Sequence, residues 1–451
     1  MDVTRILLRA GLASAIGAAA LALLAPIEDR IAAFLAVLAL WTAVSCLTWR
    51  SLARDPGPGA DEGSRAGLIL IVAAFLRLAL VLVPPTPSTD AYRYSWEGRV
   101  VGAGLSPYRF PPSAPELAFL RAGQDARINN PGLTAIYPPL ALTAFRAVAA
   151  FSIDARAQKG FFALCDLLAC ALLMRLLRRR NLSSAWAAIY AWHPLVIVEF
   201  SAAGHLDSLM ILGLLAGLEL WESGRRELGV SAWAAAALVK VVPVVLLPWL
   251  LLRHPRFAAL FFAAAAIGLL PAAAGLVAAL SAAPESGIAA FAASWLANPS
   301  LYAILSSVVE SETARRLLPA AAVFAFSFPW ARRCGGDAAR YLCGMILAVL
   351  LASPVVQPWY VLWALPLALL TPSPAALAWS WVVGFMYFAL DPALKASSAR
   401  LPWWHWLWIG EYALVYGLLA RSLYDACNER RSGQTKTHGR ISRHDRMRAA
   451  S

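Results

Sequence analysis

Long runs of apolar residues recur along this sequence and constrain its fold more than any other feature. Many are about 17–25 residues long, the length that a helix needs to cross about 30 Å of hydrocarbon. The chain of 451 residues is 60% hydrophobic and 14% charged, whereas soluble domains are typically about half apolar and a quarter charged. The sequence therefore predicts an all-α, polytopic membrane protein and not a water-soluble domain.

Two apolar stretches differ from the others because they are short or interrupted. The stretch 137–152 contains Arg146, and the stretch 230–252 contains Lys240 and two prolines. We interpret the first as an amphipathic helix in the membrane interface and the second as a pair of short half-helices. Altogether we expect about 12–14 membrane helices in one domain, residues 1–427. The uninterrupted runs occupy residues 5–25, 30–49, 66–85, 159–177, 184–201, 207–222, 257–280, 314–330, 341–354, 359–371, 375–390 and 403–422.

The distribution of basic residues predicts the orientation. Lys and Arg gather in the cytoplasmic loops of membrane proteins, so the net charge of +13 indicates this bias and not a nucleic-acid partner. Placing 137–152 in the interface keeps the arginines of 175–180 in the cytoplasm and puts the long loop 86–158 outside. Both termini are then cytoplasmic, and we expect the basic tail 428–451 to be disordered. Arg316 and its neighbour are exceptions, because they fall at an outer helix end.

The N-terminal residues admit two interpretations. A basic start followed by an apolar stretch is typical of a signal peptide, but the stretch is long and a second run follows at once, which favours a first membrane helix. The six cysteines show no CxxC spacing, and several lie inside apolar runs. We interpret them as packing residues and not as a metal site or disulfide framework.

The long outer loop carries the densest group of charges. Asp90, Arg93, Glu97 and Arg99 fall within ten residues, among tyrosines, tryptophans and prolines. Loops longer than about 15 residues are uncommon unless they are functional or disordered, and the aromatic content favours order. If this segment is helical, the spacing puts Asp90, Arg93 and Glu97 on one face. That face is either a salt-bridged surface or part of a functional site, and the aromatic and proline context favours the site.

Two other outer segments carry polar residues beside aromatic ones or glycine. His205 and Asp207 follow a glycine at a turn between two spans, and Gln357, Trp359 and Tyr360 follow a proline-broken run. The alternatives are a helix cap at the first segment and interfacial aromatic anchors at the second.

Three charged residues lie within apolar stretches, where charges are costly. Arg77 and Asp166 fall at similar depths on their helices, so we expect an ion pair between them that is at least as much structural as catalytic. Lys240 lies in the interrupted stretch. It either meets an anionic headgroup or extends toward the interface.

These residues occur in an order that resembles the GT-C superfamily of polyprenol-phosphate-sugar-dependent glycosyltransferases. The match is closest to bacterial family 87 and related α-mannosyltransferases, and to the mannosyltransferase of GPI-anchor assembly. It covers most of the chain and runs through Thr89-Asp90-x-Tyr92-Arg93-Tyr94-x-Trp96-Glu97-Gly98-Arg99, Gly104-x-x-Pro107-Tyr108, Tyr137-Pro-Pro-Leu140, His193-Pro-Leu195, Gly204-His205-x-Asp207, Lys240-x-x-Pro243 and Gln357-Pro-Trp-Tyr360.

The resemblance implies a GT-C-type helical membrane fold whose first large non-cytoplasmic loop carries the site. It also implies an inverting transfer from a polyprenyl-phosphate donor without metal or cofactor. Asp90 matches the acidic residue that serves as the base. Glu97 stands where the family frequently has Asp, so its role is in question. By this resemblance, the two spans before Arg77 precede the family's usual first helix.

The chemistry agrees with these residues. A carboxylate must take the proton of the acceptor hydroxyl, and cations must stabilise the departing phosphate. Asp90 is therefore the expected base. The candidate phosphate partners are Arg93, Lys240 and His205. Aromatic faces for the sugar or prenyl chain are offered by Trp96, Tyr137, Trp359 and Tyr360. The other expected substrate-binding residues are Glu97, Asp207 and Gln357.

We therefore predict a hexosyltransferase of the bacterial plasma membrane, with mannose as the expected sugar. Its partners would be a polyprenyl-phosphate-sugar donor, a glycan or lipid acceptor and membrane lipid. The alternative is a multispan transporter or lipid flippase, which would more often show paired repeats and a midplane site. A third reading is an inactive scaffold of envelope assembly.

Overall fold

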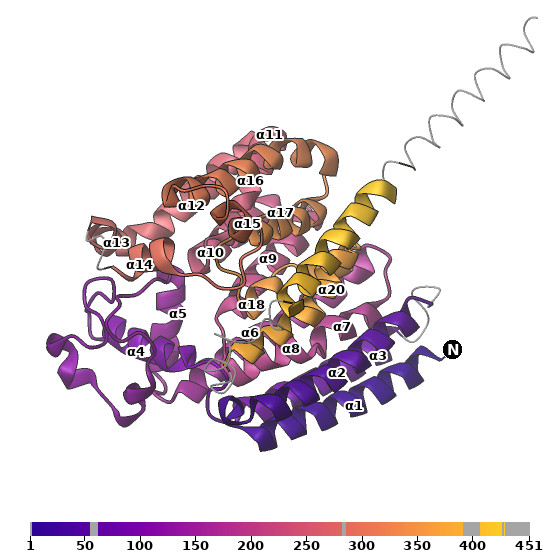
Figure 1. The fold of residues 1–451 in the computed structure, drawn as a ribbon, viewed down its shortest axis with the longest axis horizontal. Helices are drawn as coiled ribbons and strands as arrows, with labels where there is room; N and C mark the ends of the chain where they lie inside the picture. Colours follow the sequence, from indigo (N-terminus) through magenta and orange to yellow (C-terminus); the bar gives the residue numbers. More distant parts are fainter. Residues whose placement is uncertain (1, 55–61, 282–285, 391–405, 426–427, 429–451) are drawn as a thin grey trace, which may run out of the picture.

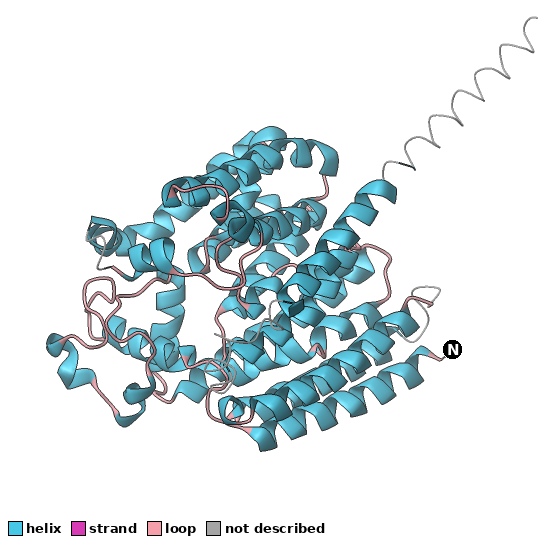
Figure 2. Cartoon of the chain, in the orientation of Figure 1, coloured by secondary structure: helices cyan, strands magenta, loops and turns pink. Residues whose placement is uncertain are grey.

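The structure, a computed structural model, describes residues 2–54, 62–281, 286–390, 406–425 and 428. Within these ranges the chain is helical and forms no strand (Figure 2). One isolated bridge joins Ala297 and Val355. The predicted all-α polytopic fold is thereby confirmed. The tail predicted to be disordered lies outside the described residues except at Asn428.

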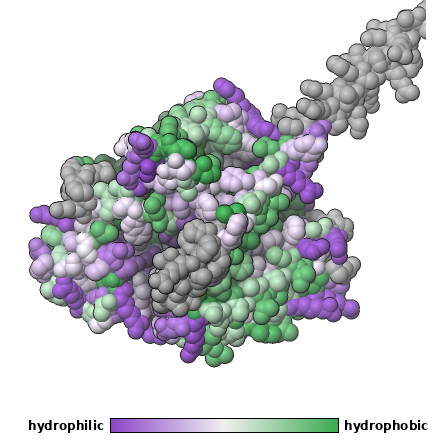
Figure 3. Space-filling view, in the orientation of Figure 1, coloured by the Kyte–Doolittle hydropathy of each residue, from purple (hydrophilic) through white to green (hydrophobic). Residues whose placement is uncertain are grey.

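Five helices of the described chain are long and apolar enough to span a membrane. They are α1 (Val3–Leu24), α2 (Ile31–Leu52), α3 (Glu62–Val81), α6 (Ala155–Arg179) and the continuous Pro255–Val277, which comprises α12 (Pro255–Leu269), η7 (Leu270–Ala272) and the start of α13 (Ala273–Ser281). Hydrophobic residues cover the flank formed by α1–α3, and hydrophilic residues gather toward the ends of these helices (Figure 3). This surface fits a membrane protein, while the number of spans stays a prediction.

Several other apolar runs are divided into shorter elements. Most of the breaks fall at or beside a proline or glycine. Proline lacks the N–H that would continue a helix, and glycine is unfavourable within one. These elements are η4 (Ser184–Trp186), α7 (Ala187–Ala191), α8 (Pro194–Ile197), η5 (Val198–Ala203), α9 (Asp207–Glu222), α14 (Gly287–Ser294), α15 (Leu301–Ser306), α16 (Glu312–Cys334), α17 (Ala338–Ala352), α18 (Pro358–Val361), α19 (Leu365–Leu370), α20 (Pro374–Val382) and η8 (Val383–Leu390). A further helix covers residues 406–425.

The predicted pair of half-helices is confirmed at Lys240. α10 (Arg226–Val239) ends there, and η6 (Val242–Leu246) and α11 (Leu247–Arg253) follow. Lys240 itself has extended backbone, with φ −153° and ψ 134°. This break exposes polar backbone within an apolar stretch, which is tolerated where it lines protein or a cavity.

The hairpin of α1 and α2 lies beside α3 (Figure 1) and holds the start of the long loop. Within the hairpin, Trp41 donates from Nε1 to Ser14 Oγ at 3.0 Å. At its turn, η1 (Ile27–Asp29), the Ile27 backbone N–H donates to Thr86 Oγ1 at 2.8 Å, and the Thr86 hydroxyl donates to Glu28. The hairpin therefore fixes the residues that lead into Asp90.

The first part of the long loop folds as α4 (Asp90–Gly102), which packs on α5 (Pro139–Ala149). Gly98 makes this contact possible, because a Cβ at this position would collide with the Phe145 carbonyl. α5 is short and crosses the direction of α1–α3 steeply (Figure 1). The remaining loop contains only the turns η2 (Pro115–Leu120) and η3 (Gly123–Arg127). The interfacial position of α5 stays a prediction.

The predicted ion pair joins α3 to α6. Arg77 Nε donates to Asp166 Oδ2 at 2.9 Å, and both side chains are buried. The Tyr190 hydroxyl donates to the other carboxylate oxygen at 2.6 Å, and Arg77 Nη1 donates to the Ala191 carbonyl at 2.9 Å. These contacts join α3, α6 and α7 at one buried ion pair. Its structural role stays a prediction.

Candidate active site

A pocket of about 640 Å³ lies among α4, the chain near 129–138, the break at Lys240, α14, α16 and the segment 353–363. It brings together residues that lie far apart in the sequence, as predicted. The predicted residues that line it are Asp90, Arg93, Tyr137, Asp207, Lys240, Gln357, Trp359 and Tyr360. Trp96, Glu97 and His205 do not line it.

Asp90 begins α4 and faces the pocket with a carboxylate that is 19% exposed. Its Oδ1 accepts a hydrogen bond from the Asn129 side-chain amide, and its Oδ2 lies 3.5 Å from His205 Nε2. Burial opposes ionisation, but His205 and Asn129 outweigh it and hold the Asp90 pKa below its ordinary value of 3.8. The carboxylate is therefore ionised at neutral pH and can accept a proton.

His205 lies behind Asp90 and not in the pocket, so the structure does not place it as a direct phosphate partner. The ring is buried and stacks on Trp359, with centroids 3.9 Å apart. Burial lowers the His205 pKa, but the carboxylates of Asp90 and Glu199 raise it to about 9. The imidazole is thus protonated at neutral pH and supplies the positive charge beside Asp90.

Arg93 reaches the pocket wall but has no free N–H. A guanidinium carries five N–H donors, and all of them have acceptors. Nε donates to Glu97 Oε1 at 2.8 Å, and the four terminal donors go to the carbonyls of Asn129, Asn130, Leu133 and Thr134 at 2.7–3.1 Å. These contacts brace the chain near Asn129. The predicted use of Arg93 as a phosphate partner would require them to break.

Glu97 and Trp96 are buried beneath the pocket. Burial, opposed by Arg93 and aided by Asp90, raises the Glu97 pKa to about 7. Trp96 packs in a separate apolar cluster, with the Arg99 guanidinium 5.1 Å from its ring centroid. The predicted substrate contacts of these two residues are therefore not seen, and both support the loop.

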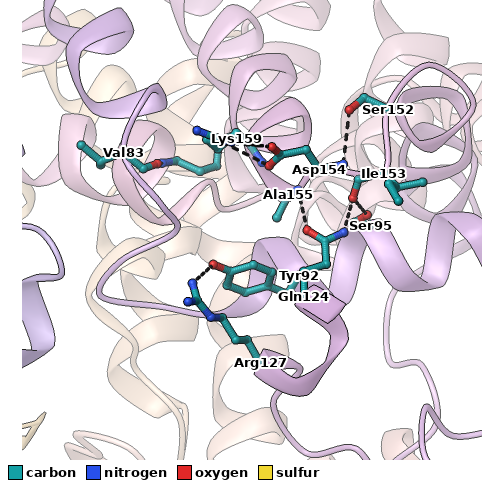
Figure 4. A network of polar contacts seen from close by, with 11 residues as sticks. Val83, Tyr92, Ser95, Gln124, Arg127, Ser152, Ile153, Asp154, Ala155 and Lys159 are labelled. Carbon is teal, nitrogen blue, oxygen red and sulfur yellow. Dashed lines mark hydrogen bonds and ion pairs between the residues drawn. The ribbon is translucent and has the colours of Figure 1, made fainter. Parts of the chain in front are cut away.

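Side-chain amide and hydroxyl groups fasten this loop to α6 (Figure 4). Ser95 Oγ donates to the Ile153 carbonyl at 2.6 Å, and Gln124 donates to the same carbonyl. Gln124 Oε1 in turn accepts from the Ala155 backbone N–H at 3.2 Å. Since α6 begins at Ala155, the network joins α4 and η3 to the chain at the start of a membrane-length helix.

Lys240 lines the pocket, and its ammonium contacts side chains of the pocket wall. Nζ lies 2.6 Å from Asp207 Oδ1, and 4.1 Å and 4.8 Å from the ring centroids of Tyr360 and Trp363. Trp363 Nε1 donates to the same Asp207 oxygen at 2.6 Å. Lys240 is thus a cation of the pocket that one carboxylate and two aromatic faces hold in place.

Arg316 is a second cation of the pocket that sequence reasoning missed. It lies on α16, lines the pocket and is 19% exposed. Nη2 donates to Glu312 Oε1 at 3.2 Å and to the Ala293 carbonyl, and the guanidinium lies over Tyr302. The signal was present in the sequence, because Arg316 violates the charge bias of outer helix ends.

Other missed residues carry weaker signals. Asn129 and Trp363 belong to segments without recognisable motifs. Glu199 had one signal, since it is an acid within an apolar run.

The turn before His205 depends on Gly204, and Gly204→Ala is expected to destabilise the protein. Gly204 has φ +79°, and an added Cβ would lie 2.5 Å from Lys159 Cγ. A left-handed conformation costs an L-residue about 1–2 kcal/mol, and the clash adds to this. We expect a lower melting temperature in detergent. Gly417→Ala is the control, because nothing lies near an added Cβ there. Equal melting temperatures for both variants would contradict this account of the turn.

A family model described as "Alpha-(1->6)-mannopyranosyltransferase, N-terminal domain" matches residues 8–256. The chain is also 30% identical over 423 residues to Alpha-(1->6)-mannopyranosyltransferase A of Mycobacterium tuberculosis (strain ATCC 25618 / H37Rv). That similarity covers 82% of this chain and 78% of the relative. No solved structure matches the chain. The family match begins inside α1, so it covers most of α1 and all of α2.

Proposed function

Because the chain belongs to the alpha-(1->6)-mannopyranosyltransferase family, we propose that it transfers mannose from a polyprenyl-phosphate donor to a glycan or lipid acceptor. Family membership itself makes the chain a glycosyltransferase. The proposal adds the lipid-linked donor, inversion at the anomeric carbon and an α-(1→6) linkage. It also adds the reaction face, which is the non-cytoplasmic face of a bacterial plasma membrane, with both termini cytoplasmic.

One observation carries this proposal. An ionised carboxylate, Asp90, and two cations, Lys240 and Arg316, line the same pocket. Transfer from a glycosyl phosphate needs a base for the acceptor hydroxyl and positive charge for the leaving phosphate. The pocket also contains aromatic side chains that can cover a sugar or a prenyl chain. It thus holds the groups that the reaction requires.

The proposed reaction is a single displacement. The acceptor hydroxyl oxygen attacks C1 of the mannosyl group, while its proton passes to an Asp90 carboxylate oxygen. The bond between C1 and the phosphate oxygen breaks, and its electron pair leaves with the polyprenyl phosphate. Attack on the face opposite the leaving group inverts C1. Lys240 and Arg316 stabilise the charge that develops on the phosphate. Independence from metal and cofactor stays a prediction.

The donor class is tested by supplying purified protein with labelled polyprenyl-phosphate-mannose or GDP-mannose and a mannan acceptor. We expect label in the acceptor from the lipid donor alone. Transfer from GDP-mannose alone would contradict the proposed donor. The transporter alternative predicts a different result, in which labelled lipid crosses a vesicle membrane and no new glycosidic bond forms.

Lys240→Gln is expected to lower kcat/KM for the lipid donor about 10- to 100-fold. A charge-assisted hydrogen bond contributes about 1.5–3 kcal/mol, which corresponds to that range. Steady-state kinetics with varied donor measures the loss. Lys240→Arg retains the charge and should keep more activity than Lys240→Gln. Unchanged kcat/KM in a folded Lys240→Gln protein would remove Lys240 from the phosphate site.

A further inference from the structure

A second carboxylate, Glu199, stands behind the base. Glu199 Oε2 lies 2.8 Å from His205 Nδ1, and His205 Nε2 lies 3.5 Å from Asp90 Oδ2. The imidazole is therefore placed between two carboxylates, one inside the pocket and one outside it. Glu199 and His205 are both fully buried. Glu199 does not line the pocket and has no direct route to a substrate.

The local fold is built to bring these two side chains together. Glu199 belongs to the π-helical element η5, and the chain then turns at Gly204 with a left-handed backbone. The His205 backbone N–H donates back to the Glu199 carbonyl at 2.9 Å. The wide helical turn and the reversal at Gly204 thus place residues six positions apart side by side. Single π-helical turns of this kind frequently mark functional sites.

The His205 ring is stacked on an aromatic side chain, and each of its nitrogens lies near a carboxylate. It stacks on Trp359 with an interplanar angle of 17°. An aromatic face favours a cation above it, and so do two flanking carboxylates. Among the described residues, His205 is the only cation in contact with Glu199. The other titratable groups around this arrangement are Arg93 and Tyr94 on α4, Lys159 on α6, Asp207 on α9, and Lys240.

We propose that Glu199 is a positioning residue, which acts through His205 to keep Asp90 ionised and directed at the acceptor hydroxyl. This inference rests on the proposed role of Asp90 as the base. A protonated imidazole contacts Asp90 from the side away from the pocket and so leaves Asp90 able to accept a proton from the substrate. Glu199 lies 2.8 Å from the other nitrogen of that imidazole, and a buried carboxylate and a buried imidazole in contact each favour the charged form of the other.

The pH dependence follows from the charges. Asp90 works when ionised, so activity falls as the pH drops through its lowered pKa. The arrangement also needs protonated His205, so a second loss is expected as the pH rises through about 9, the raised pKa of His205. Without the charge of Glu199, the His205 pKa should fall toward its ordinary 6.5. Asp90 would then lose its charged partner at a lower pH, so the pH range of activity should shorten on its basic side. The acid side should stay, because His205 is still protonated where Asp90 titrates.

Glu199→Gln tests this because it removes the charge and keeps the shape. We expect kcat to fall about 10- to 100-fold, as for other groups that orient a reacting residue, with donor KM changed less than about threefold. In a plot of kcat/KM against pH from 4 to 10, the decline on the basic side should move from about pH 9 to a lower pH. A loss of rate by the same factor at every pH would indicate a merely structural role and overturn the proposal.

Two comparisons complete the test. In a His205→Gln background, Glu199→Gln should have little further effect on kcat, because neighbours that act through one another are not additive; additive losses would overturn the proposal. If Glu199→Gln does not fold, the inference is tested with His205→Gln alone. The decline of kcat/KM near pH 9 must then disappear, and a decline that persists in His205→Gln would contradict the inference.

Glu219→Gln is the matched control. It removes a buried carboxylate near the C-terminal end of α9, where Arg175 and Arg179 contact it. It should keep the parent pH profile, and a narrowed profile in this variant would overturn the specific role given to Glu199. Asp90→Asn is measured in parallel. If Asp90→Asn stays active, the proposed base is wrong. If Asp90→Asn is inactive while Glu199→Gln keeps the parent profile, only the role of Glu199 is wrong.

Discussion

Asp90→Asn is expected to lower kcat for mannosyl transfer by at least about 100-fold. A positioned base contributes about 10²–10⁴-fold to a rate, and an amide cannot take the proton of the acceptor hydroxyl. The substituted side chain keeps its size and its contact with Asn129, so donor KM should change little. Loss of kcat with little change in KM indicates a group that acts in the transition state.

The measurement is the initial rate of mannose incorporation by purified protein at saturating donor. Asp154→Asn is the matched control, because Asp154 is an exposed aspartate of the same loop that caps α6 and pairs with Arg156. Asparagine also serves as an N-cap, so this control should transfer mannose at nearly the parent rate. A folded Asp90→Asn protein as fast as Asp154→Asn would exclude Asp90 as the base.

Arg77→Met is expected to lower the free energy of unfolding by about 3–5 kcal/mol. Removing one partner of a buried ion pair leaves an uncompensated charge, and the cost is commonly of this size. Asp166 would keep only the Tyr190 hydroxyl as a hydrogen-bond donor. The Ala73 and Ala191 carbonyls would also lose the Arg77 guanidinium. The expected damage is therefore to stability, since no atom of this pair lines the pocket.

Thermal unfolding in detergent compares Arg77→Met with the double variant Arg77→Met/Asp166→Leu. The double variant removes both charges, so it should regain a large part of the lost stability. If the double variant is less stable than Arg77→Met, the unpaired charge is not the source of the loss. If Arg77→Met unfolds at the parent temperature, the ion pair does not hold α3 to α6.

The predictions from sequence succeeded where the signal is local. Apolar runs predicted membrane-length helices because a helix satisfies its own backbone in lipid. Lys240 and two prolines predicted the broken helix, since each is unfavourable within an uninterrupted apolar helix. Arg77 and Asp166 were paired from their depth alone. The order of polar residues along the chain also predicted that Asp90, Asp207, Lys240 and Tyr360 belong to one site. All four line the same pocket.

The orientation of side chains inside the site could not be predicted from the sequence. Arg93 is a cation in the expected segment, but its terminal donors go to carbonyls about 40 residues later in the chain. His205 lies beside the pocket, but the π-helical turn before it directs the ring behind Asp90. Both differences have one cause. Which face a side chain presents depends on the path of distant segments, and spacing along one helix carries no information about that path.

Arg316 and Glu199 show how a local exception can still be informative. Arg316 contradicts the charge bias expected of an outer helix end, and Glu199 interrupts an apolar run. Each is costly in a membrane protein unless it has a partner or a function. In the structure Arg316 lines the pocket, and Glu199 contacts His205. A residue that violates the pattern around it therefore merits a place among the site candidates.

An experimental structure of Asp90→Asn bound to polyprenyl-phosphate-mannose would test most directly whether this pocket holds the donor and the base. We expect the donor phosphate to lie within hydrogen-bond distance of Lys240 or Arg316. We also expect the mannosyl C1 to face residue 90, with room for an acceptor hydroxyl between them. A donor whose phosphate binds outside this pocket, or whose C1 is remote from residue 90, would contradict the account.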